Sequence, residues 1–352
     1  MLRNIWIDVL TPKQAMLLGS LTIKLISRGY NTILTTRDYD YTQAVLHNLG
    51  LKPIVIGRYG YTVLEKLIED IDRMRKLVEL LRDSFDIAIA YPNPVAARIA
   101  FGLSKPYIAL TDSPHSEAAS RLSIPLASYV VFSRCIPEAS IEVYVYKEKT
   151  KLVQYNGVDE VEWLKDVEPD LGYIKSLELE PYSYVVARPP EVKASYYRYP
   201  EVFNIFKKLI DAVLGIGFKI LYLPRYRDDP LIPSLSTREN VVIPSRDRGV
   251  IGYHVVYYAV STITGGGTLA REAALLGTYG ISLYPEELYV DKCVRDWGLP
   301  LARCRSEEEC LKILYSSLRD PEKYKSYARS VLKSLEKPSD AVFKILEEVG
   351  GN

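Results

Sequence analysis

Strand-like and helix-like segments alternate along most of this 352-residue chain, and this alternation constrains its fold more than any other feature. In the first half, short apolar runs typical of buried strands are separated by segments with helical spacing. The runs lie at 4–10, 31–36, 52–57, 85–90, 105–110 and 127–133, and the helical segments at 12–28, 39–49, 62–82, 94–102 and 114–124. Such alternation predicts a parallel, doubly wound α/β sheet.

The alternation pauses in a charged, proline-punctuated stretch at 160–182 and then begins again. The second set of apolar runs lies at 183–188, 218–224, 240–244, 255–263 and 278–284, with a helical segment at 199–215. The chain is also too long for one ordinary core. We therefore expect two doubly wound, Rossmann-like domains facing a cleft. Their predicted bounds are 1–165 and 180–335, and a helix in 336–352 is expected to pack back on the first domain.

Composition excludes several classes of function. The formal net charge is +1, with 45 basic and 44 acidic side chains, so no nucleic-acid partner is expected. No apolar run reaches the roughly 18 residues of a membrane span. The chain begins directly on a strand pattern, without the apolar core and cleavage site of a signal peptide. We expect a cytoplasmic protein with no transmembrane segment, and a peripheral place at a membrane stays open.

The four cysteines form no CxxC pair, and with only three histidines in the chain a metal site is not expected. Cys304 and Cys310 are close enough in sequence to pair. Unpaired thiols are favoured for a cytosolic chain, unless the source is a hyperthermophile. Scarce glutamine, 28 tyrosines and many balanced charges hint at such a source.

The sequence TITGGGTLAREAALLG at 262–277 predicts a strand, a glycine turn and a helix. Gly265, Gly266 and Gly267 would let a phosphate approach the backbone, and Thr268 is a candidate cap of the helix that follows. The helix dipole would favour the anion. Glu272, one turn later, would accept hydrogen bonds from ribose hydroxyls. The alternative is a sharp turn that needs positive φ, for which one glycine is enough. Neither a P-loop nor an N-terminal GxGxxG motif is present.

The same stretch resembles the nucleotide-sugar loop of enzymes with the GT-B fold, among them UDP-N-acetylglucosamine 2-epimerases and the N-acetylglucosaminyltransferases of peptidoglycan synthesis. In those families a turn of small residues holds the diphosphate and a glutamate one helical turn later holds the ribose. The resemblance assigns these roles to the three glycines and to Glu272, and it places Gly277 at the end of the helix.

Nearly the whole chain is similar to an uncharacterised, mainly archaeal family of unknown function with a predicted GT-B-like fold. The similarity rests on IWID and its following proline, SRGYNTILTTRD, TDSPHSEAASRLSIPLA, YNGVDEVEWL, YVVARPPEVKASYY and the glycine loop. The family usually has a histidine soon after the first strand, where this chain has Lys13. If that histidine is catalytic, its role is changed or lost here.

Two arginines follow strands of the second domain and are candidate diphosphate ligands, because the guanidinium fork matches phosphate oxygens. Arg188 ends the first of these strands, where the resembling epimerases carry a basic residue, and Arg225 follows the next. The structural alternative for both is an ion pair, and Asp228 and Asp229 are near enough to serve Arg225.

Asp112 and His115 follow the fifth strand of the first domain and are candidates for an acid–base pair. The alternative is that Asp112 or Ser113 caps a helix with His115 in its first turn. Asp8 ends the first strand, where it would bind an acceptor hydroxyl or cap the next helix.

These observations and resemblances imply a metal-independent glycosyltransferase that uses a nucleotide sugar, expected to be UDP-linked, and needs no cofactor. The acceptor is unknown, and a lipid-linked acceptor stays open. The first alternative is a UDP-N-acetylhexosamine 2-epimerase, and the second is a non-catalytic protein that binds a nucleotide sugar or glycan.

Overall fold

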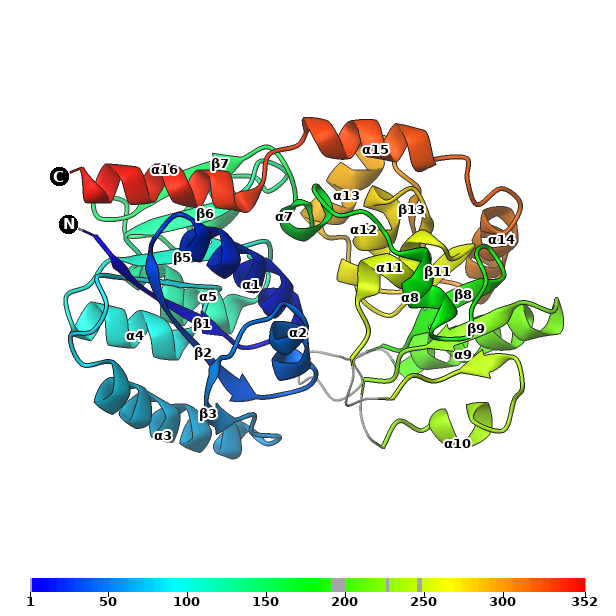
Figure 1. Cartoon of the computed structure of the whole chain (residues 1–352), viewed down its shortest axis with the longest axis horizontal. Helices are drawn as coiled ribbons and strands as arrows, with labels where there is room; N and C mark the ends of the chain where they lie inside the picture. Colours follow the sequence, from blue (N-terminus) through cyan, green and yellow to red (C-terminus); the bar gives the residue numbers. More distant parts are fainter. Residues whose placement is uncertain (1, 191–199, 226–227, 246–248, 352) are drawn as a thin grey trace. The chain divides into compact units, whose positions relative to one another are not determined.

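The computed structural model of the chain describes residues 2–190, 200–225, 228–245 and 249–351. The chain divides into two compact units, each built on a parallel sheet of its own (Figure 1). Unit 1 comprises Met1–Trp163 and Leu335–Asn352, and unit 2 comprises Leu164–Ser334.

Unit 1 contains a seven-stranded sheet in the order β3-β2-β1-β4-β5-β6-β7. Its strands are β1 (Asn4–Val9), β2 (Asn31–Asp38), β3 (Ile54–Arg58), β4 (Ile87–Ala90), β5 (Tyr107–Thr111), β6 (Tyr129–Ser133) and β7 (Lys151–Tyr155). Its helices are α1 (Pro12–Ser27), α2 (Thr42–Asn48), α3 (Val63–Leu81), α4 (Pro94–Gly102), α5 (Glu117–Ser123), the 3-10 turn η1 (Ile124–Leu126), α6 (Ala139–Glu142) and α16 (Pro338–Gly350), with α7 (Val161–Leu164) at the boundary. Strands β4, β5 and β6 are buried throughout, as expected for parallel strands covered on both faces.

Side-chain caps fix where the helices of unit 1 begin. Thr11 accepts a hydrogen bond from the Gln14 amide at the start of α1, and Asn93 accepts from two amides at the start of α4. Thr62 and Glu65 form a reciprocal capping box on α3. Helices α1 and α4 therefore begin close to the carboxyl ends of β1 and β4. The loops that join each strand to its helix are short, and they carry polar side chains.

Helix α16 packs against β6 and β7. Its first turn is held by a buried polar contact, in which the Ser339 amide donates to Glu162 Oε2 at 2.9 Å. Lys24 of α1 pairs with the same carboxylate and donates to the Ser339 hydroxyl at 3.2 Å. The end of the chain is thereby fixed to unit 1.

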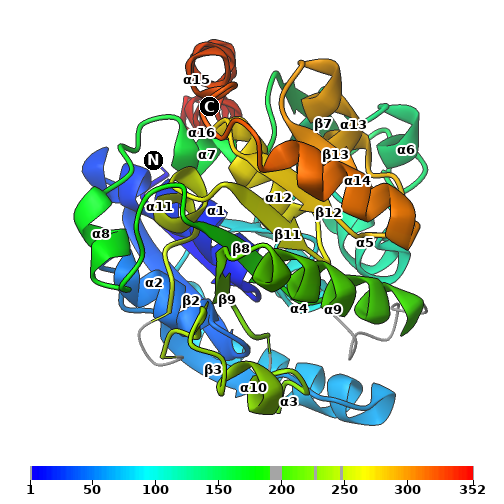
Figure 2. The same ribbon diagram turned by 90° about the vertical axis from the view of Figure 1, so that its right-hand side faces the viewer.

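Unit 2 contains a six-stranded parallel sheet in the order β10-β9-β8-β11-β12-β13. Figure 2 labels five of these strands, β8, β9, β11, β12 and β13. Its strands are β8 (Tyr184–Arg188), β9 (Lys219–Tyr222), β10 (Val241–Val242), β11 (Ser261–Thr264), β12 (Tyr279–Ser282) and β13 (Leu301–Arg303). Its helices are α8 (Leu171–Lys175), α9 (Pro200–Gly215), α10 (Ile232–Leu235), α11 (Gly252–Tyr257), α12 (Thr268–Leu275), α13 (Tyr289–Asp296), α14 (Glu307–Ser317) and α15 (Lys325–Ser334).

The two faces of the second sheet are covered by different helices. One face forms a core with α9 and α14, in which Val185, Ile263 and Ile281 of the sheet are buried. The other face packs so closely on α12 that a Cβ at Gly280 would lie 2.1 Å from the Ala270 carbonyl oxygen. Helices thus cover both faces of the sheet, so the ends of the strands are the places left for a ligand.

The predicted elements differ most from the structure in two stretches. The run 255–263 was expected to be a strand, but α11 extends to Tyr257 and β11 begins only at Ser261. A continuous apolar run cannot by itself distinguish a buried helix from a buried strand. The stretch 285–337, where no element was predicted, contains α13, β13, α14 and α15.

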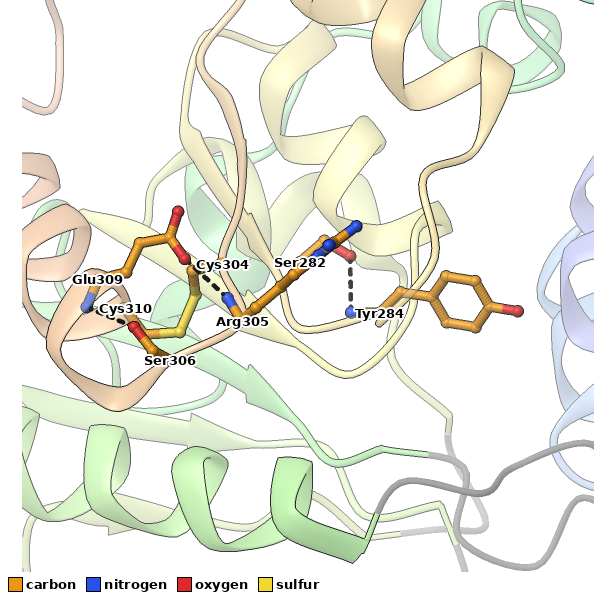
Figure 3. The surroundings of a disulfide bond; sticks show 7 residues. All are labelled: Ser282, Tyr284, Cys304, Arg305, Ser306, Glu309 and Cys310. Carbon is orange, nitrogen blue, oxygen red and sulfur yellow. Dashed lines mark hydrogen bonds between the residues drawn. A yellow bond between two sulfur atoms is a disulfide. The ribbon is translucent and has the colours of Figure 1, made fainter.

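Cys304 and Cys310 form a disulfide, with their Cα atoms 5.2 Å apart (Figure 3). The expectation of unpaired thiols is therefore wrong for this pair. The chain turns sharply between β13 and α14, where Ser306 accepts from the Glu309 amide and Glu309 accepts from the Arg305 amide. This helix cap brings Cys310, in the first turn of α14, back beside Cys304.

No helix among the described residues is long and apolar enough to cross a membrane.

Candidate functional site

The strand order of unit 2 reverses direction between β8 and β11, which lie side by side. Ligands of open α/β sheets bind outside the carboxyl ends of the strands at such a switch point. The predicted glycine turn leaves the sheet here, directly after β11. Arg188, the last residue of β8, lies in register with Thr264, the last residue of β11. The candidate residues from these two strands therefore meet at one edge.

The three glycines of the turn serve different purposes. None has positive φ, so the interpretation of the turn as a positive-φ requirement is wrong. A Cβ at Gly265 would lie 2.2 Å from Pro190 Cα, and one at Gly267 would lie 2.4 Å from Arg271 Nη1. At Gly266 the nearest atom would be Arg225 Nη2, at 3.3 Å. Packing therefore explains two of the glycines, and Gly266 is the one that packing alone does not require.

The backbone amides of Gly265 and Gly266 are hydrogen-bonded within the protein, so the turn offers a ligand the first amides of α12 instead. The Gly265 N–H donates to the Arg188 carbonyl at 3.1 Å, and the Gly266 N–H donates to Thr264 Oγ1 at 3.2 Å. Gly267 is the N-cap of α12 and has no side chain to cap it, and Thr268 is its first residue rather than its cap. The first amides of a helix have no partner within that helix, so an anion bound here would be held from Gly267 onward.

Arg225 lies across the glycine turn. Its Nε donates to the Pro189 carbonyl at 2.8 Å, which fixes the guanidinium beside Gly266. Asp229 was a candidate ion-pair partner of Arg225. Its carboxylate instead accepts hydrogen bonds from the Tyr222 hydroxyl and from the Leu231 amide. The structure thus places the Arg225 side chain beside Gly266 and the backbone of Arg188 beside Gly265. The resembling segment 191–197 lies outside the described residues.

Glu272 lies on the fifth residue of α12, and its side chain is turned toward α11. A Cβ at Gly252 would come within 2.6 Å of Glu272 Oε2, and Glu272 is 7% exposed. Burial raises the pKa of the neighbouring Tyr253, and the charge of Glu272 adds to this shift. The Glu272 carboxylate therefore lies in a confined space beside Gly252, one helical turn after the glycine turn.

A buried ion pair beneath the turn was not anticipated from the sequence. Arg271 Nη1 lies 2.5 Å from Asp291 Oδ1 of α13, and both side chains are almost fully buried. The pair fills the space next to Gly267, which explains why no side chain fits there. In the sequence, Arg271 and Asp291 look like ordinary charged residues on the solvent-exposed faces of helices, so nothing indicated that they form a buried pair.

The strand order of unit 1 reverses between β1 and β4, and Asp8 lies there at the end of β1. It is 1% exposed and receives four donors. Arg73 donates with both terminal nitrogens at 2.9 and 2.5 Å, Asn93 donates at 2.5 Å and Thr35 at 2.6 Å. Thr11, and not Asp8, caps α1. The Asp8 carboxylate is therefore engaged in holding four elements together.

A second network at the same edge is centred on Lys13. Its Nζ pairs with Asp112, lies 2.8 Å from Asp159 Oδ2 and donates to the Tyr91 hydroxyl at 2.9 Å. Tyr91 and Tyr155 both donate to Asp159, Tyr155 at 2.6 Å. Burial raises the pKa values of both tyrosines well above their usual range, and the nearby carboxylate charges add to this. The Lys13 side chain is 18% exposed and so reaches the surface.

The structure places Asp112 and His115 in different surroundings. Asp112 is buried, pairs with Lys13 and accepts from the Ser113 hydroxyl at 2.6 Å. His115 is exposed in a turn, and α5 begins only at Glu117 with Ser116 as its N-cap. Capping of this helix by Asp112 or Ser113 is therefore wrong. Sequence reasoning missed Tyr91 and Asp159, although Tyr91 directly follows the predicted strand at 85–90.

No group of three or more His, Cys, Asp or Glu side chains within the described ranges could hold a metal ion.

Residues 3–349 match the family described as "Protein of unknown function (DUF354)". The chain belongs to this family. An uncharacterised protein of Methanocaldococcus jannaschii, MJ0665, is 27% identical over 301 residues, which cover 82% of this chain and 84% of that protein. The family resemblance found in the sequence is thereby confirmed.

Solved structures resemble the chain over nearly its whole length. The UDP-GlcNAc 2-epimerase of Methanocaldococcus jannaschii, determined with UDP-GlcNAc and UDP, matches with a TM-score of 0.74 and 14% identity over 98% of this chain and 99% of that one. The spinosyn forosaminyltransferase SpnP matches with a TM-score of 0.61 and 12% identity over 99% of each chain. These likenesses confirm the predicted GT-B and epimerase-like fold, with two parallel α/β sheets.

Proposed function

We propose that the chain binds a UDP-linked sugar through unit 2 and transfers the sugar to an acceptor as a metal-independent glycosyltransferase. The observation that carries this proposal is the glycine turn at the switch point, with Arg225 beside Gly266. A diphosphate needs close approach to the backbone, oriented amide donors and a cation, and this edge supplies all three. The proposed ligands are the amides of Gly267 and Thr268 with the side chains of Arg188 and Arg225.

Glu272 is the proposed ribose ligand. A carboxylate can accept hydrogen bonds from two vicinal hydroxyls, and its place one turn into α12 suits a ribose whose diphosphate rests on the turn. In the leaving step, the amides and arginines would stabilise the negative charge that develops on the diphosphate, which is the task that a metal performs in other transferases.

Unit 1 would supply the groups that act on the acceptor. Asp112 is the proposed proton acceptor, with the exposed His115 of the same loop as the alternative. The Lys13 ammonium would orient the Asp112 carboxylate. Asp8 would act only by positioning, because its four donors already occupy its oxygens.

Epimerisation of a UDP-N-acetylhexosamine is the second candidate. It is supported by the fold shared with solved UDP-GlcNAc 2-epimerases, among them that of Methanocaldococcus jannaschii. The two reactions differ in one requirement, since an epimerase converts the donor alone and a transferase needs an acceptor. Proton NMR of UDP-GlcNAc incubated with the protein alone distinguishes them: a new anomeric signal supports the epimerase, and an unchanged donor supports the transferase.

Binding is tested by thermal unfolding with UDP-, GDP-, ADP- and dTDP-sugars. A ligand at a hundredfold excess over its Kd stabilises the protein by about 2.7 kcal/mol. We expect UDP-sugars to give the largest shift. Glu272→Gln should weaken binding about tenfold through the loss of charge-assisted hydrogen bonds. The control Glu308→Gln, on an exposed position of α14, should bind as the wild type does. If no nucleotide sugar shifts the transition of the folded protein, the donor site does not exist.

A further inference from the structure

Unit 2 contains a cavity of about 130 Å³ at the end of α12 opposite the glycine turn. Its walls come from the segment 164–169, from Tyr257, from the last residues of α12 and from α15. The eight residues of α12 separate it from the turn by roughly 12 Å. The cavity is therefore a separate place from the proposed donor site.

Basic side chains outnumber acidic ones around this cavity. Lys165, Lys325, Arg329 and Lys333 line it, against Asp166 and Glu168. Arg329 pairs with Glu168 at 2.8 Å, but both side chains are more than 60% exposed, so water screens this pair. The charge of the lining favours an anionic ligand.

Lys325 is partly buried and makes several contacts within unit 2. Its Nζ donates to Thr278 Oγ1 at 2.6 Å and to the Tyr257 carbonyl, and it lies 4.1 Å from the centre of the Tyr257 ring. Within the described parts of the chain, Lys325 forms no ion pair with a carboxylate. Glu322, the acidic residue nearest in sequence, accepts from the Tyr182 hydroxyl instead.

The surroundings of Lys325 disfavour its positive charge. Burial lowers its pKa to about 7, and the charge of Glu322 offsets this only in part. The Tyr257 ring and carbonyl favour the ammonium, but burial has the larger effect. An anion in the cavity would supply the missing negative charge and restore the proton.

We propose that this cavity binds the phosphate group of a small molecule, with the partly buried Lys325 as the counter-charge and Arg329 as a second contact. Phosphate suits a site with several cations because it accepts several charge-assisted hydrogen bonds. A cavity of about 150 Å³ holds a molecule the size of benzene, so this one has room for a free phosphate or the phosphate end of a short ester. The proposal does not depend on the function proposed above.

The first test is isothermal titration with inorganic phosphate at pH 7 and constant ionic strength. We expect saturable binding, weakened at least tenfold by Lys325→Met and less strongly by Arg329→Gln. The matched control is Lys323→Met, which removes the same charge from an exposed position two residues away. It should bind phosphate as the wild type does. Tighter binding of glycerol 3-phosphate than of phosphate would identify the ligand as a short ester, and the reverse would identify the free ion.

The second test measures proton uptake on binding sulfate, which does not titrate near pH 7. Titrations at pH 7.5 in buffers of different ionisation heat should show partial proton uptake in the wild type and none in Lys325→Met. The other charged or titratable groups around Lys325 are Glu322, Tyr257, Lys165, Asp166, Glu168, Arg329 and Lys333. If uptake persists in Lys325→Met, one of these groups and not Lys325 takes the proton.

The proposal is overturned by absent phosphate binding, by equal binding in Lys325→Met and wild type, or by tighter binding of acetate than of phosphate. Circular dichroism shows whether Lys325→Met is folded. If it is not, Arg329→Gln decides whether the cavity is the phosphate site: weaker binding than in the wild type supports the proposal, and unchanged binding overturns it.

Discussion

At the scale of single residues, the glycine turn shows how identical neighbours can be required for different reasons. Gly265 is needed because Pro190 lies against it, and Gly267 because the Arg271–Asp291 pair lies against it. Gly266 meets only the end of a flexible arginine side chain. The sequence predicted a close approach to this turn, but it could not distinguish an approach by the protein itself from an approach by a ligand.

Substitution of these glycines should separate stability from binding. In Gly265→Ala the new methyl would meet backbone atoms of Pro190, which cannot move aside as a side chain does. We expect a loss of about 3 kcal/mol or more in the free energy of unfolding. Gly266→Ala should cost less than about 1 kcal/mol. Urea unfolding measures both, and equal losses in the two variants would contradict this account of the turn.

The Asp8–Arg73 pair should be essential for the stability of unit 1. Removing one partner of a buried ion pair leaves an uncompensated charge, so Arg73→Met is expected to cost about 3–5 kcal/mol. Arg75→Met, on the same helix but 60% exposed, is the control and should cost less than about 1 kcal/mol. A loss below 1 kcal/mol for Arg73→Met would show that the Asp8 carboxylate does not depend on this pair.

At the scale of elements, α1, α3 and α4 were predicted from helical spacing to within one residue of their bounds, whereas the helices between 285 and 337 were missed. The structure adds the reason why these three helices begin where they do, since Thr11, the Thr62–Glu65 box and Asn93 cap them. Helices α13, α14 and α15 bury few residues, and some of these are polar or small, such as Asp291, Ser317 and Ala328, so the stretch 285–337 shows few apolar positions in the sequence. Its turn at 304–310 is fixed by a helix cap and a disulfide, and this combination has no signature in cysteine spacing alone.

The disulfide between β13 and α14 should stabilise unit 2 modestly, because it closes a short loop. For a separation of six residues, the chain-entropy relation gives about 2 kcal/mol. The double variant Cys304→Ala, Cys310→Ala should lose about this amount in urea unfolding. Peptide mass analysis of the wild type should recover the two cysteines in one linked fragment, and recovery of two separate thiol peptides would contradict the bond.

At the scale of the whole molecule, buried tyrosines make stability depend on alkaline pH. Burial raises the pKa of Tyr155 well above its usual range, so the folded protein keeps a proton that the unfolded chain loses near pH 10. The contribution of the protonated Tyr155 to the free energy of unfolding is therefore fully present below pH 10. As pH rises further, this contribution falls by up to about 1.4 kcal/mol per pH unit.

Unfolding at pH 8 and pH 11 tests this effect. The stability lost between the two values should be smaller in Tyr155→Phe than in the wild type. Tyr61→Phe is the control, because Tyr61 is 76% exposed, and it should lose as much as the wild type does. An identical loss in all three proteins would show that the Tyr155 phenol does not contribute.

The residues of the candidate donor site could be proposed from the sequence because they lie in one strand–turn–helix unit or, like Arg188 and Arg225, at the ends of predicted strands. The glycine turn and Glu272 lie within one strand–turn–helix unit, so spacing was enough to find them. The network of Lys13, Tyr91, Asp112, Tyr155 and Asp159 depends on which strands are neighbours, and the sequence does not give the strand order. The sequence could mark Lys13 as a departure from the family, but not show which carboxylates it joins.

The central claim is that a diphosphate rests on the glycine turn of unit 2. It is tested most directly by the Kd of UDP for the wild type, Gly266→Ala and Gly215→Ala, measured by isothermal titration. Gly215 is an exposed residue with no atom near a new Cβ, so Gly215→Ala makes the same chemical change away from the turn. We predict that the wild type and Gly215→Ala bind UDP equally and that Gly266→Ala binds at least about tenfold more weakly, because its methyl occupies the path of the diphosphate. Equal affinity in all three proteins, or no binding of UDP by the wild type, would contradict the claim.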